Sequence, residues 1–146
     1  MEMERNIVSA LGGPKILGKH IRGATDLIDL VEKGLPWSAA FHLKESFGIT
    51  DREYARMLGV SERTLTRHKA QLQKRLGLVE SDRLYRMARI FALAQEVLED
   101  DKRAMAWLRR SQIGLGSRTP LDMMRTEVGA REVEDLLGRI EHSVYS

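Results

Sequence analysis

The sequence predicts an all-α protein, and three observations support that prediction. Strand signals are nearly absent, and aromatic residues make up only 5% of the 146 residues, which argues against a β-sandwich built on aromatic strands. Only three prolines interrupt the chain. Amphipathic runs alternate with residue types that begin helices (serine, threonine and aspartate) and with glycine, which commonly ends them.

The first half of the chain is expected to contain four helices, each closed by a glycine. Serine, threonine or aspartate stands near three of the starts: Ser38 can cap the second helix, Thr50 and Glu53 form a capping-box pattern, and Ser61 can cap the fourth. The expected helices span 26–33, 38–47, 51–58 and 61 to about 76, and they close at Gly34, Gly48, Gly59 and Gly77.

The second half is expected to contain one long helix followed by shorter ones. Apolar residues recur at core-facing spacing from about 84 to 98, and proline follows a threonine cap at the start of a later helix. The expected starts are, in order, Ser81 or Asp82, Asp100 or Asp101, Thr119 before Pro120, and Gly129. The glycine-rich residues 114–117 are the best candidate for a boundary, as a flexible joint inside the C-terminal half.

Composition narrows the function classes. The chain has no cysteine, which excludes disulfides, thiolate nucleophiles and zinc sites with cysteine ligands. No apolar stretch approaches the roughly 20 residues of a membrane helix, and the first residues lack the layout of a secretory signal. We therefore expect a cytoplasmic protein.

Charge is distributed unevenly along the chain. Residues 51–89 carry ten basic and five acidic side chains, whereas residues 119–146 carry three basic and six acidic ones. A basic middle indicates a polyanionic partner, and an acidic end indicates a different, basic one. Ordinary solvated helix faces are the alternative explanation.

Residues 49–65 have the spacing of a helix-turn-helix. Ala55 stands where a second helix must approach closely, and Gly59 suits a left-handed turn conformation. Val60 can fill the turn as an apolar plug, Ser61 can cap the second helix, and Leu65 can face the core. Two packed helices with a polar face and no DNA partner remain an alternative.

The remaining face of the second helix carries side chains that can reach base edges and phosphates from a major groove. The candidate DNA-binding residues are Ser61, Arg63, Thr64, Arg67, His68 and Lys69. Arg63 and Arg67 are candidates for bidentate contacts to guanine, and Ser61 and Thr64 for contacts to phosphate.

Enzyme functions find little support. Residues 13–19 match the G-x-x-x-x-G-K pattern of phosphate-binding loops, but His20 stands where a hydroxyl residue would hold magnesium. The four histidines show no metal-ligand spacing, so no metal or other cofactor is expected. A nucleotide-binding enzyme stays open as the weaker hypothesis.

Nearly the whole chain resembles the Xre/MbcA/ParS-type antitoxins, which are partners of RES-domain toxins. The matching segments are residues 11–18, 58–65, 94–98, 106–108, 119–122 and 129–142, the last being the most specific. Two positions depart from the family pattern, since Ala106 stands where asparagine is common and Ser143 where glycine is common.

The resemblance implies two regions with different tasks. Residues 1–89 would form a helical Xre-like region containing the helix-turn-helix (about 50–76), and residues 90–146 a small helical toxin-binding region. The C-terminal segment would cover the active site of a RES toxin, an NAD-using protein that resembles ADP-ribosyltransferases. The implied toxin-binding residues are Trp107, Arg139, Glu141, His142, Tyr145 and Ser146.

The first region would repress the operon that encodes the pair, as a homodimer or within a larger toxin–antitoxin assembly. The sequence thus predicts a binding protein with no catalytic residues. A stand-alone transcriptional regulator, with C-terminal helices that only dimerise or sense a small molecule, is the alternative.

Overall fold

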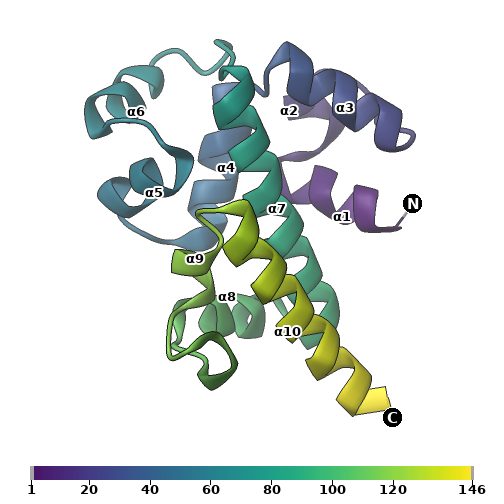
Figure 1. The fold of residues 1–146 in the computed structure, drawn as a ribbon. Helices are drawn as coiled ribbons and strands as arrows, with labels where there is room; N and C mark the ends of the chain where they lie inside the picture. The colour runs from purple at the N-terminus through teal and green to yellow at the C-terminus, as the bar shows by residue number, and fades with distance from the viewer. Residues whose placement is uncertain (1, 146) are drawn as a thin grey trace. The chain divides into compact units, whose positions relative to one another are not determined.

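The computed structural model describes residues 2–145, with side chains described for residues 3–143, and it divides into two compact units. The first unit extends to Ala88 and the second begins at Arg89, so the division falls within helix α7 (Leu78–Leu98). Every regular element in the described part is helical (Figure 1), which confirms the predicted all-α class. None of the described helices is long and apolar enough to cross a membrane.

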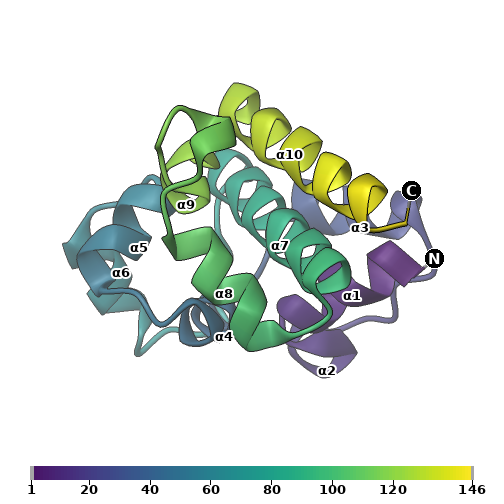
Figure 2. The same ribbon diagram turned by 90° about the horizontal axis from the view of Figure 1, so that it is seen from below.

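The first unit is arranged around one central helix, α4. Its elements are α1 (Glu2–Ala10), α2 (Gly13–Leu17), α3 (Ala24–Lys33), α4 (Trp37–Phe47), α5 (Asp51–Leu58), α6 (Glu62–His68) and the first part of α7. Helix α4 packs against α1 and α2, and α5 packs against α6 (Figures 1 and 2). The side chains of Leu43 and Phe47 on α4 are fully buried, which places the core of this unit along α4.

The N-terminus of α4 is capped by backbone carbonyls from a distant segment. Pro36 precedes the helix, and Ser38 lies within it, so the predicted Ser38 cap is wrong. The Trp37 amide donates to the Lys74 carbonyl at 2.9 Å, and the Ser38 amide donates to the Leu72 carbonyl at 3.0 Å. These bonds satisfy two amides that have no partner within their own helix.

The same bonds explain why α6 is shorter than predicted. The sequence predicts a helix to about Leu76, but α6 ends at His68, and residues 69–76 turn back over the start of α4. The Leu76 amide donates to the Leu35 carbonyl at 2.8 Å, and the Leu76 side chain is buried. Tertiary contacts therefore override the helical propensity of this segment.

Helix α7 begins at Leu78, three residues before the predicted cap at Ser81. The Ser81 side chain is buried, and its Oγ accepts a hydrogen bond from the Leu35 amide at 2.8 Å. The hydroxyl that the sequence suggests as a helix cap thus pairs with a backbone amide far away in the sequence.

The second unit consists of the rest of α7, α8 (Asp101–Arg109), the 3₁₀ turn η1 (Ile113–Leu115), α9 (Pro120–Met123) and α10 (Glu127–Tyr145). The predicted caps are present, since Asp100 accepts from the Lys102 amide and Thr119 accepts from the Asp122 amide. Helix α9 packs against both α8 and α10 (Figure 2).

Residues 114–117 lie inside this second unit and the chain divides at residues 88–89, so the boundary predicted at 114–117 is wrong. Leu115 is buried, and the backbones of Gln112 and Arg118 pair across the base of the turn. The glycines here allow a tight 3₁₀ turn, with Gly116 at a φ of 65°.

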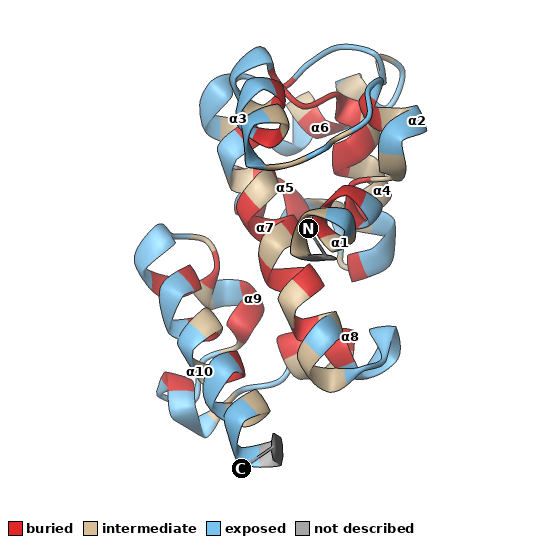
Figure 3. Cartoon of the chain, turned by 90° about the vertical axis from the view of Figure 1, so that its right-hand side faces the viewer, coloured by how far each residue is buried: buried red, intermediate tan, exposed pale blue. Residues whose placement is uncertain are grey.

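Helix α10 begins at Glu127 and contains Gly129, whereas the sequence predicts that Gly129 precedes the helix. The Gly129 amide donates to the Thr126 side chain at 3.0 Å. A Cβ atom at Gly129 would lie 1.8 Å from the Met123 carbonyl oxygen, so only glycine lets α9 approach the first turn of α10. The buried side of α10 is a narrow stripe formed by Ala130, Val133 and Leu137 (Figure 3).

The two glycines of α10 predict opposite effects of one substitution. Gly129→Ala should destabilise the protein by roughly 1–3 kcal/mol or more, because the new methyl group collides with backbone. Gly138→Ala should stabilise it by roughly 0.5–1 kcal/mol, since Gly138 lies within the helix and faces open space. Urea denaturation followed by circular dichroism measures both changes, and equal effects from the two variants would contradict the assigned packing.

Candidate nucleic-acid and protein interfaces

The predicted helix-turn-helix is present as α5, a three-residue turn and α6. Thr50 caps α5 by accepting from the Glu53 amide at 3.1 Å, and α5 ends at Gly59, whose φ of 82° is left-handed. The amides of Gly59 and Val60 both donate to the Ala55 carbonyl. Ser61 then caps α6 by accepting from the Thr64 amide at 3.0 Å.

The inner sides of α5 and α6 are apolar and buried. Ala55 and Leu58 on α5 are buried, as is Leu65 on α6, in agreement with the predicted core positions. Tyr54 is also buried, its hydroxyl donates to the Ala40 carbonyl of α4, and burial raises its pKa far above the ordinary value. The motif is therefore anchored to the central helix of its unit.

The outer side of α6 carries four of the predicted DNA-binding residues. Arg63 and Arg67 are exposed one helical turn apart, and within the described residues neither forms an ion pair. The Ser61 hydroxyl donates to the Thr64 hydroxyl oxygen at 2.9 Å, which leaves the Thr64 proton free to donate to an incoming acceptor. Ser61, Arg63, Thr64 and Arg67 thus form the surface that the sequence predicts to face DNA, and we call it the DNA-facing surface.

His68 and Lys69 are engaged within the unit. The His68 ring stacks on Trp37 of α4, with ring centroids 4.2 Å apart, and its Nδ1 lies 2.9 Å from the Thr64 carbonyl oxygen. Lys69 Nζ lies 2.7 Å from a carboxylate oxygen of Asp51. These two residues hold the end of α6 and are less available to DNA than the sequence suggests.

Asp51 connects three helices through its carboxylate. It accepts from Lys69 and, at 2.9 Å, from Lys44 of α4. The hydrogen bonds from Lys69 and then Lys44 lower the pKa of Asp51, so the carboxylate keeps its charge to a lower pH than an unpaired aspartate does. Sequence reasoning missed Asp51 and Trp37 as supports of α6, because their partners lie far away in the sequence.

The predicted toxin-binding residues lie in the second unit, on α8 and at the end of α10. Arg139 and His142 are exposed, Glu141 is half-buried, and Trp107 on α8 is half-buried. The Tyr145 side chain and all of Ser146 lie outside the described residues. The structure thus places the described members on exposed or partly exposed helix positions.

Part of the acidic charge of α10 is paired within the unit. Arg89 Nη2 lies 2.8 Å from a carboxylate oxygen of Glu134 and 3.6 Å from one of Glu127. Glu132 and Asp135 are exposed, and neither forms an ion pair with another described residue. They leave the outer side of α10 acidic.

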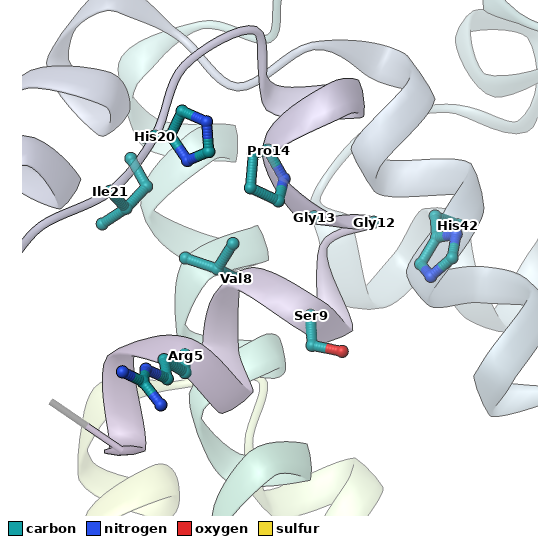
Figure 4. A pocket seen from close by; sticks show the side chains of 9 residues that line it. All are labelled: Arg5, Val8, Ser9, Gly12, Gly13, Pro14, His20, Ile21 and His42. Atoms are coloured by element: carbon teal, nitrogen blue, oxygen red, sulfur yellow. The ribbon is translucent and has the colours of Figure 1, made fainter.

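The residues of the phosphate-loop pattern form a helix instead of a loop. Gly13–Leu17 is α2, and Lys19 lies 3.6 Å from Asp26, so the lysine is not directed at a phosphate site. A pocket of about 510 Å³ lies beside α2, lined by Arg5, Val8, Ser9, Gly12, Gly13, Pro14, His20, Ile21 and His42 (Figure 4). Lys19 does not line it, and the described residues include no cluster of three metal-ligating side chains.

Both halves of the chain match known protein families. Residues 26–89 match the family described as the antitoxin Xre-like helix-turn-helix domain. Residues 93–142 match the family described as the antitoxin Xre/MbcA/ParS C-terminal toxin-binding domain.

Individual relatives agree with these matches. The chain is 34% identical over 131 residues to "Antitoxin Xre" of Yersinia enterocolitica, covering 89% of this chain and 88% of that one. It is 29% identical over 137 residues to "Antitoxin Xre" of Photorhabdus laumondii, covering 93% and 88%. A protein of the same name from Pseudomonas putida is 37% identical over 65 residues, covering 44% and 41%.

The capped helix-turn-helix, the helical second unit and these matches lead to one conclusion: the chain belongs to the Xre antitoxin family, with a helix-turn-helix domain followed by a C-terminal toxin-binding domain.

Proposed function

We propose that this protein is an antitoxin that inhibits a RES-domain toxin and represses its own operon. One observation carries the proposal. The same chain contains a helix-turn-helix with two exposed arginines and a segment that matches a toxin-binding domain. Both tasks consist of binding another macromolecule, so the protein itself needs no catalytic residue or cofactor.

The DNA-facing surface suits a major groove. Arg63 and Arg67 project from the same side of α6, and each can donate two hydrogen bonds to one guanine, worth about 1–3 kcal/mol of discrimination against another base. Thr64 can donate to a phosphate. Lys69 and His68 contribute mainly by holding the C-terminal end of α6 in place.

A homodimer is the expected DNA-binding form. Helix-turn-helix dimers place their recognition helices about 34 Å apart, which is one turn of DNA. The operator should therefore be a palindrome with half-sites spaced by one helical turn.

The toxin-facing surface consists of Trp107, Arg139, Glu141, His142, Tyr145 and Ser146. In our proposal this surface covers the toxin's active site, with the end of α10 as the closing element. A cleft that binds the pyrophosphate of NAD needs basic groups, and the acidic outer side of α10 complements such a cleft. Tyrosine and arginine are also residue types that frequently dominate binding energy.

Substitution of the two exposed arginines tests the DNA-facing surface. Arg63→Ala with Arg67→Ala should weaken operator binding at least tenfold and reduce the dependence on salt, because two phosphate or base contacts disappear. Fluorescence anisotropy with a labelled operator at two salt concentrations measures this. Arg103→Ala with Arg110→Ala removes the same charge from exposed positions of the second unit and should leave operator affinity nearly unchanged.

Inhibition of the toxin should survive the Arg63 and Arg67 substitutions. If the variant keeps its fold and still loses inhibition, the division of tasks between the two surfaces is wrong.

Truncation after Leu137 tests the toxin-facing surface. The shortened chain keeps the buried stripe of α10 and the whole helix-turn-helix, so it should bind the operator but no longer inhibit the toxin. Growth on co-expression with the RES protein encoded beside it measures inhibition. Full inhibition by the truncated chain would contradict the proposal that the tail covers the toxin's active site. If the intact chain fails to co-purify with the RES protein, the stand-alone regulator becomes the favoured function.

A further inference from the structure

Ile113 is the most exposed large apolar side chain in the described part of the protein. It lies on η1 and is 95% exposed, compared with 76% for Val128 and 55% for Ile28. A single exposed apolar residue needs no explanation in general, but this one lies at the tip of a turn that is held in one conformation.

Several contacts fix the turn beneath Ile113. The side chain of Leu115 is buried, and the Gln112 amide donates to the Arg118 carbonyl at 3.0 Å. The Ser117 amide donates to the Gln112 carbonyl at 3.0 Å. The backbone of the turn is therefore ordered before any partner binds, so little backbone freedom is lost when a partner covers Ile113.

The turn also contacts both elements of the toxin-facing surface. Gln112 Nε2 donates to the Trp107 carbonyl at 3.0 Å. On the other side, η1 packs against α10, and a Cβ atom at Gly114 would lie 2.9 Å from a methyl group of Leu136. Leu136 lies one helical turn before Arg139, so the turn that carries Ile113 packs beside the part of α10 that leads to the tail residues.

We propose that Ile113 is an apolar anchor that inserts into a hydrophobic pocket of the toxin, beside the site covered by the tail. This inference rests on the proposed function and extends it, because Ile113 is not one of the residues of the toxin-facing surface. The occupant is the toxin because Ile113 lies within residues 93–142, the segment matched to a toxin-binding domain. An exposed apolar side chain on an ordered turn can be fully desolvated in a pocket of a partner, and fully desolvated contacts contribute most to binding energy.

The test compares two isoleucine-to-serine variants of the full-length protein. Ile113→Ser should weaken binding to the purified toxin tenfold or more, mainly through faster dissociation, whereas Ile28→Ser on α3 should change it less than twofold. Ile113→Leu should recover most of the affinity, because it restores an apolar side chain of equal size. Thermal unfolding should be similar for all variants, since the replaced side chains are exposed, and biolayer interferometry measures the binding.

The outcomes separate this inference from the proposed function. Wild-type affinity of Ile113→Ser would overturn the anchor while leaving the antitoxin proposal intact. Unchanged toxin affinity together with a lost dimer in light scattering would overturn it as well, by assigning Ile113 to a contact between copies. Absence of any binding by the wild-type protein would remove the proposed function and the anchor together.

Discussion

The arrangement of the first unit depends on which groups accept hydrogen bonds from the backbone amides at the N-terminus of α4. The amides of Trp37 and Ser38 need acceptors, and the carbonyls of Leu72 and Lys74 supply them. The chain can deliver those carbonyls only if it leaves the helical conformation soon after His68. Helix α6 is therefore short, its end is held by the stacking of His68 on Trp37, and its outer side is left for Arg63 and Arg67.

A comparable constraint shapes the second unit. The backbone of α9 lies so close to the first turn of α10 that Gly129 has no room for a side chain. Only a narrow stripe of α10 is buried, and most of its remaining circumference is free for a partner (Figure 3). In both units the inner side of a helix is fixed by packing, and the residues that we propose for DNA and toxin binding lie mainly on the side that packing does not use.

Local signals in the sequence were sufficient for the helical class, for the helix-turn-helix and for the caps at Thr50, Ser61, Asp100 and Thr119, because each cap involves residues two or three positions apart. Local patterns were misleading where the residue's hydrogen-bond partner lies far away in the sequence. Ser81 has the chemistry of a cap but bonds to the Leu35 amide, and residues 69–76 have helical character but serve α4. Two further features follow from tertiary structure that no short pattern encodes. They are the ion pair between Lys69 and Asp51 and the exposure of Ile113.

In our proposal two separate surfaces perform the two tasks, and hydrogen–deuterium exchange of the full-length protein can distinguish them. Operator DNA alone should slow exchange in residues 50–76 and leave α10 unchanged. Toxin alone should slow exchange in residues 107–145 and leave α6 unchanged. Protection of α6 by the toxin without protection of α10 would show that the two tasks are not divided between these surfaces.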